Sequence, residues 1–319
     1  MPHVVLGLDI GGANLKAATA DKRAVSVPFA LWKQPDRLPA ALAELVAQFP
    51  DATELAVTMT GELCDCYETK RQGVNAILDA VESVSHGRMA RVWGTDGKFS
   101  TVADARANYL TVAAANWHAL ATFACRYAEE PTLLIDMGST TTDIIPLSAR
   151  GPRNYGRTDL ERLEHKELVY VGVRRTPLCG VLGFDGAMEF FATTLDVYLL
   201  LGQLAENPAD RDTADGRPAT IPYAHARVAR MKCADAETMS LADAKQLATE
   251  IHERIVAKVV DAAGRCQRVV TSGAGEFLAR EVAKRMGAKE IVSLNGLLGP
   301  AASACAPAYA LAARANESS

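Results

Sequence analysis

The chain lacks any apolar run that approaches the roughly 20 residues of a bilayer-spanning helix. Its first residues, MPHVVLGLDIGG, have neither the basic segment nor the small-residue cleavage site of a secretory leader. These two absences argue against the membrane-spanning and exported classes of protein. We therefore expect a cytoplasmic protein with no membrane partner.

A surplus of positive charge is also missing. The 319 residues include 34 Lys and Arg against 38 Asp and Glu, which gives a formal net charge of −4, and the basic residues are scattered along the chain. Proteins that bind nucleic acid concentrate Lys and Arg in a patch or a stripe. The sequence therefore predicts no nucleic-acid partner.

Cysteines are few and mostly isolated among apolar residues, which argues against a disulfide framework. There are seven, an odd number, as expected for reduced thiols in a cytoplasm. Cys64 and Cys66 form the one close pair, and only His86 follows within a plausible loop. Because a zinc site needs further ligands at finger-like spacing, we favour packed thiols here and assign them no role.

What is present is a pattern of strands and helices that runs twice. At about 150 residues per domain, the length predicts two domains. Apolar periodicity in the first part predicts strands at 4–9, 14–19, 24–31, 54–60 and 90–93, and helices at 38–49, 74–81 and 104–127. After residue 130 it predicts strands at 132–136, 141–147, 168–173, 268–271 and 290–293, helices at 184–201, 240–263, 276–286 and 300–313, and an exposed loop at 207–222.

The openings of the two parts align with one another. LGLDIGGANLK at 6–16 matches LLIDMGSTTTD at 133–143, so that Asp9 corresponds to Asp136 and Gly11 to Gly138. A single turn of this kind carries little information, but two of them at the heads of two half-chains indicate a duplicated domain.

The first opening has the composition of a phosphate-binding turn. Gly11 and Gly12 leave backbone N–H groups open to close approach by a phosphate. Asp9 supplies a hard oxygen ligand that suits hydrated Mg²⁺. Asn14 and Lys16 share one face of a strand, so both reach the same anion. A hairpin turn with a capping aspartate remains the alternative for this segment.

Two later segments offer similar chemistry. Between the carboxylates of Asp136 and Asp143, polar donors and acceptors for an anion and its metal come from Gly138, Ser139, Thr140 and Thr141. A strand then leads through glycines into a helix, where backbone amides favour an anion or the edge of a nucleotide, at Gly273, Ala274, Gly275 and Glu276. Ordinary strand-to-helix turn chemistry remains an equal alternative for the last of these.

The order of these three segments resembles the superfamily of sugar and acetate kinases, heat-shock chaperones and actin. The resemblance covers essentially the whole chain and implies an α/β fold of two ribonuclease-H-like lobes with the site in the cleft between them. We expect a first lobe at 1–128, completed by a C-terminal helix at 300–319, and a second lobe at 129–299 with an insertion at 150–240.

Further motifs resemble the hydantoinase/oxoprolinase-related branch, and within it the tetrahydromethanopterin-linked one-carbon-transfer pathway proteins. They are VTMTGEL at 57–63, AANW at 114–117, LVYVGVRRTP at 168–177 and TADGRPA at 213–219. The resemblance implies a synthase of methanofuran biosynthesis, a transferase that joins an aminomethylfuran diphosphate to the phenol of glutamyl-tyramine and releases pyrophosphate. A tyrosine-based acceptor is also compatible with the sequence.

On this resemblance each motif residue receives an expected role. We assign Mg²⁺ to Asp9 and Asp136, with Asp143 as a further metal partner. The diphosphate is assigned to the glycine and hydroxyl residues of the two openings and to Asn14 and Lys16. The organic substrates are assigned to Thr60, Gly61, Asn116, Trp117 and Arg174. Arg174 and Arg175 would face opposite ways on a strand, so at most one serves. Glu62 and Asp65 are both candidates for the base that deprotonates the phenol, and Lys16 is an electrostatic alternative.

Other functions use the same segments. An ATP-dependent small-molecule kinase shares these loops and would transfer phosphate, whereas a regulatory protein would bind a nucleotide without turnover. Hydantoin or oxoproline hydrolysis is less expected, because the chain has about the length of the bare two lobes. The sequence is compatible with a monomer and with a homo-oligomer.

Overall fold

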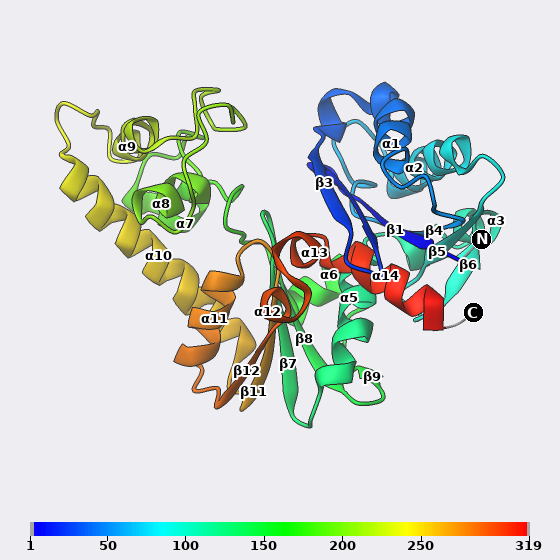
Figure 1. Cartoon of the computed structure of the whole chain (residues 1–319). Helices are drawn as coiled ribbons and strands as arrows, with labels where there is room; N and C mark the ends of the chain where they lie inside the picture. The colour runs from blue at the N-terminus through cyan, green and yellow to red at the C-terminus, as the bar shows by residue number, and fades with distance from the viewer. Residues whose placement is uncertain (1–2, 318–319) are drawn as a thin grey trace. The chain divides into compact units, whose positions relative to one another are not determined.

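The computed structural model describes residues 3–317. It divides into two compact units (Figure 1). The first unit holds the described residues of Met1–Leu134, Ile145–His165 and Val292–Ser319, and the second holds Ile135–Ile144 and Lys166–Ile291. Residues 145–165 thus group with the first unit, although they were expected in the second lobe. The two units therefore have other boundaries than the two expected lobes, and the lobes remain a prediction.

The first sheet has the strand order β3-β2-β1-β4-β5-β6. Its strands are β1 (Val5–Ile10), β2 (Asn14–Thr19), β3 (Ala24–Pro28), β4 (Glu54–Met59), β5 (Met89–Trp93) and β6 (Phe99–Thr101). The first three are antiparallel neighbours, because the connections between them are too short for a parallel crossover. In contrast, β1, β4 and β5 are parallel and are joined through helices.

Apolar residues cover both faces of this sheet. Leu6, Leu8 and Ile10 of β1 pack in a core with α1 (Leu38–Val46) and α2 (Lys70–Ser85). On the opposite face, α14 (Ala306–Glu317) packs against β1 and α5 (Asn116–Ala124) (Figure 1). Because successive side chains of a strand alternate between faces, Val5 and Asp9 lie on the α14 side.

The second sheet repeats the order of the first. Its strands run β10-β8-β7-β11-β12, with β9 paired to β8. They are β7 (Thr132–Met137), β8 (Thr142–Ser148), β9 (Gly151–Pro152), β10 (Leu168–Val169), β11 (Arg268–Ser272) and β12 (Glu290–Ser293). The turn after β1 is closed by Gly11 N–H to Asn14 O at 3.0 Å, and the turn after β7 by Gly138 N–H to Thr141 O at 2.8 Å. The predicted duplication is confirmed.

The second unit also contains a group of helices inserted between the strands. They are α7 (Leu178–Leu182), α8 (Thr194–Leu200), α9 (Ile221–Arg230) and α10 (Leu241–Ala263), which pack on one another, and α11 (Glu276–Arg285), which follows β11 (Figure 1). Ser240 caps α10 by accepting a hydrogen bond from the backbone N–H of Asp243 at 3.1 Å.

Several predicted elements are shorter than expected. The helix at 104–127 is three helices, α3 (Val102–Ala107), α4 (Tyr109–Val112) and α5, and the helix at 300–313 is split into α13 (Pro300–Ala304) and α14. The break between α4 and α5 contains Ala114, which adopts a left-handed conformation with φ of 48° that a helix does not allow. The strand at 24–31 ends at Pro28, and only residues 168–169 of the strand at 168–173 pair.

The apolar segment 184–201 is the largest misassignment. Only α8 in its second half is helical, whereas Phe184, Met188 and Phe190 are exposed. Six strands and α-helices were not predicted: β6, β9, α6 (Asp159–Glu164), α7, α9 and α12 (Leu294–Leu298). Short 3-10 helices occur at Leu31–Lys33, Pro35–Arg37, Cys125–Tyr127 and Gly183–Asp185.

Among residues 3–317 no helix combines the length and apolarity needed to cross a membrane.

Candidate functional site

Three polar side chains lie side by side on β2, β1 and β4, the central strands of the first sheet. In the strand register Asp9 of β1 lies beside Lys16 of β2 and Thr58 of β4, so the three side chains share the face that α14 covers. The Lys16 Nζ lies 3.8 Å from the Asp9 carboxylate. Asp9 and Thr58 are buried, and Lys16 is partly exposed. The structure thus places Asp9 and Lys16, which were both predicted, next to one another. It also places Thr58 beside them, a residue that the sequence pattern did not single out.

The turn after β1 contacts the turn after β4. The backbone N–H groups of Thr60 and Gly61 both donate to the Ile10 carbonyl oxygen, at 2.9 and 3.1 Å. A Cβ atom on Gly12 would lie only 2.6 Å from the Cys64 sulfur, so this thiol packs directly against the turn. The first unit therefore brings together the predicted residues at the ends of two neighbouring parallel strands, namely Asp9, Gly11, Gly12, Asn14, Lys16, Thr60 and Gly61.

Glu62 follows this turn and is buried, with 1% of its surface exposed. Among the described residues its Oε2 has no hydrogen-bond partner. Burial raises the pKa of Glu62 to about 7, although its own backbone N–H and the charge of Lys70 oppose the shift. A carboxyl group with this pKa exchanges its proton near neutral pH, as a general base requires. Asp65, the other candidate, is exposed.

The backbone of Ala114, which precedes Asn116 and Trp117, is near enough to the Glu62 carboxyl group to favour its ionised form. Asn116 begins α5, and its side chain accepts a hydrogen bond from the Trp117 N–H at 2.7 Å. The Trp117 ring is buried, and the guanidinium of Arg162 lies 4.1 Å from the ring centroid. Arg162, on α6, was not predicted, since α6 itself was not.

The His118 side chain is packed against aromatic rings, and we assign it no catalytic role. Its ring lies between those of Trp93 and Trp117, with centroid distances of 5.9 and 5.3 Å. Burial lowers the pKa of His118 to about 4, so the ring is neutral at physiological pH. This placement agrees with the absence of His118 from the predicted site.

In the second unit, the turn after β7 is held by the segment that follows β10. The Val173 N–H donates to Gly138 O, and those of Arg174 and Arg175 donate to Ser139 O, at 2.9 to 3.1 Å. A Cβ atom on Gly172 would overlap the backbone of Ser139 and Thr140. The hydroxyl-rich turn Ser139–Thr140–Thr141 is therefore fixed by backbone contacts, which leaves its side chains available to a ligand.

The third predicted segment lies against the end of β7. Gly273 has a φ of 92°, which favours glycine, and a Cβ atom there would lie 2.8 Å from Asp136 Oδ1. The Gly275 N–H donates to Met137 O at 2.8 Å, and the Thr271 hydroxyl lies 3.2 Å from Glu276 Oε1. The second unit thus brings together Asp136, the turn 138–141 and the turn 273–276. Asp143 is buried further along β8, opposite Leu168.

Both arginines of the 174–175 pair bind one loop. Arg174 forms an ion pair with Asp210 at 2.6 Å, and Arg175 one with Asp212 at 3.3 Å. The expectation that they face opposite ways is wrong, because residues 174–175 form a turn instead of continuing a strand. The role of Arg174 toward a substrate remains a prediction.

Oxygen ligands make Mg²⁺ the metal that the predicted residues fit. Carboxylates of Asp9, Asp136 and Asp143 and the hydroxyls of the 139–141 turn are the hard donors that this ion prefers. Within residues 3–317 the one group of three possible ligands within 4.8 Å of one another is His252, Glu253 and Glu281. Arg285 already binds both of those carboxylates, at 2.5 to 2.8 Å. We therefore do not assign a metal to that group.

Known proteins share this sequence and fold. The hydantoinase/oxoprolinase family matches residues 54–318. The (4-{4-[2-(gamma-L-glutamylamino)ethyl]phenoxymethyl}furan-2-yl)methanamine synthase of Methanocaldococcus jannaschii is 33% identical, over 98% of this chain and 97% of its own length. A synthase of the same name from Methanococcus vannielii is 28% identical, over 60% of this chain and 93% of its own length.

A solved structure supports the fold. The nucleotide-free structure of an acetone carboxylase covers 98% of this chain and 70% of its own chain with a TM-score of 0.56 and 11% sequence identity. At this identity the similarity concerns the fold alone. The resemblance predicted from the motifs is confirmed by the family match and by the relatives: the chain belongs to the hydantoinase/oxoprolinase family and, within it, groups with these furan methanamine synthases.

Proposed function

We propose that the chain is a transferase of methanofuran-type cofactor biosynthesis. It joins (5-aminomethylfuran-3-yl)methyl diphosphate to the phenol of γ-glutamyl-tyramine and releases pyrophosphate. The observation that carries this proposal is the 33% identity with the M. jannaschii synthase, which extends over 98% of this chain and 97% of that enzyme. The name of that enzyme describes the aryl ether that the reaction forms.

The reaction breaks the carbon–oxygen bond to the diphosphate and forms a carbon–oxygen bond to the phenol. Negative charge builds on the leaving oxygen, where fixed donors stabilise the transition state most. The backbone N–H group of Gly12 and the ammonium of Lys16 supply such donors in the first unit, where the Gly11 N–H closes the turn onto Asn14 O. Ser139, Thr140 and Thr141 supply hydroxyl groups in the second. Mg²⁺ held by Asp9 and Asp136 would neutralise part of the diphosphate charge.

The phenol must lose its proton as the ether forms, and Glu62 is the residue that we assign to receive it. A buried carboxylate with a pKa of about 7 is ionised in half of the molecules at that pH. Its Oε2 has no hydrogen-bond partner among residues 3–317, so accepting a proton breaks no existing bond. Thr60, Gly61, Asn116 and Trp117, which lie next to Glu62 in sequence or structure, are assigned to the organic substrates.

The direct test is to incubate the protein with Mg²⁺, the furan diphosphate and γ-glutamyl-tyramine. We expect the ether by mass spectrometry and one pyrophosphate for each ether, without ATP. If ATP is consumed and a phosphorylated product appears instead, the protein is a kinase of the same fold. If it binds a nucleotide tightly and forms neither product, it is a regulatory protein.

We also propose a cytoplasmic location. The seven cysteines are all free, as is usual in a reducing compartment. Recovery of the native protein from the soluble cytoplasmic fraction of its host would support this location, and recovery from another compartment would contradict it.

A further inference from the structure

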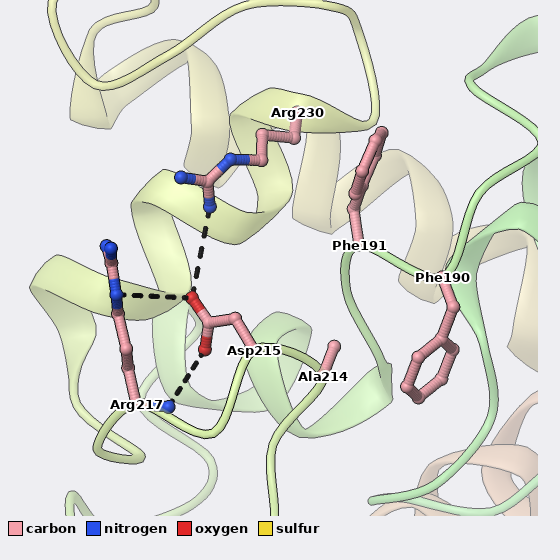
Figure 2. Close-up of a pocket in the computed structure, with 6 residues that line it drawn as sticks. All are labelled: Phe190, Phe191, Ala214, Asp215, Arg217 and Arg230. Atoms are coloured by element: carbon pink, nitrogen blue, oxygen red, sulfur yellow. Dashed lines mark hydrogen bonds and ion pairs between the residues drawn. The ribbon is translucent and has the colours of Figure 1, made fainter.

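A cavity of about 230 Å³ lies in the second unit, away from the phosphate-type turns in sequence. Figure 2 shows its lining, in which phenylalanine rings flank one side and arginine side chains the other, with Asp215 between the two arginines. The lining residues are Phe190, Phe191, Ala214, Asp215, Arg217 and Arg230. None of them belongs to the site described above.

The charged groups of this cavity have unused hydrogen-bonding capacity. Asp215 Oδ2 lies 3.9 Å from the Arg230 guanidinium and 4.0 Å from that of Arg217, too far for hydrogen bonds. The side chains of Asp215, Arg217 and Arg230 are 25%, 56% and 39% exposed. A carboxylate oxygen and two guanidinium groups are therefore open to a ligand within one small space.

The other carboxylate oxygen of Asp215, Oδ1, is held in place by hydrogen bonds. Asp215 Oδ1 accepts hydrogen bonds from the Arg217 N–H at 3.1 Å and from Arg227 at 3.0 Å. Arg227 is fully buried and also donates twice to Asp196, at 2.7 and 2.8 Å. Burial alone would raise the pKa of Asp215, but these donors outweigh it and the pKa is lowered. Arg217 and Arg230 thus present positive charge beside the negative Asp215 Oδ2, so the cavity offers groups of both signs to a ligand.

The loop that carries Asp215 and Arg217 is connected to the turn after β7. A bridge between Asn207 and Ala219 closes the loop, and the ion pairs of Asp210 and Asp212 join it to Arg174 and Arg175. The backbone N–H groups of those two arginines donate to Ser139 O. A ligand in the cavity is thus held by the same framework as the hydroxyl-rich turn.

We propose that this cavity binds the free ammonium and carboxylate head of an amino acid, which is the γ-glutamyl end of the phenolic acceptor. Arg217 and Arg230 bind the carboxylate and Asp215 Oδ2 binds the ammonium, while Phe191 packs on the methylene groups. A drug-sized ligand fills a pocket of roughly 300 to 1,000 Å³, so a cavity of about 230 Å³ suits the head alone. The identity of the acceptor rests on the proposed function.

The kinetic test compares Arg230→Met with the wild-type protein on γ-glutamyl-tyramine and on tyramine, which keeps the phenol but lacks the glutamyl head. Loss of a charge-assisted hydrogen bond is expected to raise KM for γ-glutamyl-tyramine about 10-fold or more. We expect kcat, and KM for tyramine, to stay unchanged. Arg211→Met is the matched control, because Arg211 lies on the loop of Asp215 and Arg217 but outside the cavity lining, and its side chain reaches only Gly216 O, at 3.5 Å.

A binding measurement separates this inference from the proposed reaction. In calorimetry without the furan diphosphate, γ-glutamyl-tyramine should bind the wild type and Arg211→Met alike, and bind Arg230→Met about 10-fold or more weakly. If the ether forms but Arg230→Met changes neither KM nor binding, the cavity assignment is wrong and the function stands. If no ether forms and binding still depends on Arg230, the cavity assignment stands and the function is wrong. Absence of both activity and binding rejects both.

Discussion

A carboxyl group surrounded by protein keeps its proton to a higher pH than one in water, and Glu62 is such a group. As a base it acts only when ionised. We therefore expect kcat/KM for ether formation to rise with pH and to level off above a pKa of about 7. Glu62→Gln should remove this dependence and lower kcat by about 10²- to 10⁴-fold, the usual contribution of a general base.

The pH–rate profile of Asp65→Asn distinguishes the two candidate bases. Asp65 is exposed three residues after Glu62. If Glu62 is the base, Asp65→Asn keeps the wild-type profile. A profile that disappears in Asp65→Asn and persists in Glu62→Gln would transfer the role to Asp65.

The same pKa predicts how stability changes with pH. The folded-state pKa of Glu62 is about 7, above the ordinary value of 4.5, so between these pH values the folded protein binds more protons than the unfolded chain. The contribution of Glu62 to the free energy of unfolding therefore falls as pH rises through this window.

Glu62→Gln should thus stabilise the protein at pH 8, by roughly 3 kcal/mol for a shift of about 2.5 pKa units, and have little effect at pH 4.5. Urea unfolding of both proteins at the two pH values measures the difference. An equal effect of the substitution at both values would show that the buried charge is not its cause.

At the scale of elements, the approach of α14 to β1 depends on a glycine. A Cβ atom on Gly7 would overlap the carbonyl oxygen of Ala308, so the helix must move away from the sheet in Gly7→Ala. We expect a loss of about 1 to 3 kcal/mol in the free energy of unfolding, as for other overpacked cores.

Gly180→Ala is the matched control for this substitution. Nothing lies within 4 Å of a Cβ atom at Gly180, which is inside α7. An alanine there should stabilise the protein by up to about 1 kcal/mol through helix propensity. Thermal and urea unfolding compare the two variants, and equal stability of Gly7→Ala and Gly180→Ala would contradict the close contact.

The elements that the sequence predicts well are those with a local signal. The buried run of β1 and the glycine that follows it are enough to place Asp9 at a strand end, and the matching run of β7 does the same for Asp136. By contrast, Ala114 is a good helix former in a left-handed conformation. In that conformation the Ala114 backbone lies near the carboxyl group of Glu62, which is distant in sequence, and no neighbouring residue in the sequence indicates it.

In the candidate site, too, the residues with a local sequence signal could be predicted and those placed by long-range contacts could not. Glycines and hydroxyl residues in the turns could be predicted because their chemistry lies within a few residues. Thr58 and Arg162 could not, since each is placed by a partner distant in sequence, Asp9 through the strand register and Trp117 through a ring contact. The cavity around Asp215 depends on the segment 184–191 being irregular, where apolar spacing predicted a helix.

At the scale of the whole molecule, each sheet carries one copy of the same turn, and the proposed reaction requires both copies to act on one diphosphate. Asp9→Asn and Asp136→Asn should each lower kcat by about 10²-fold or more, while the unfolding transitions stay close to wild type. Residues that act as a unit have non-additive effects. The double variant should therefore be little worse than the more severe single variant.

Steady-state kinetics of the two single variants and the double variant provide the measurement. Effects that multiply in the double variant would mean that the two turns serve separate steps. Undiminished activity of Asp136→Asn would remove the second turn from the reaction altogether.

The packing of α14 on β1 also bears on how the protein is made. Val5, Ala56 and Trp93 of the first sheet share a core with Leu311 and Ala315 of α14, which follow them by more than 200 residues in the chain. Until α14 has been synthesised, this face of the first sheet is covered only by the segment of Ala115 and Ala119, and apolar side chains on it stay exposed. We expect holdase chaperones to bind a nascent chain in this state. Truncation before α14 would leave these apolar side chains exposed and favour aggregation.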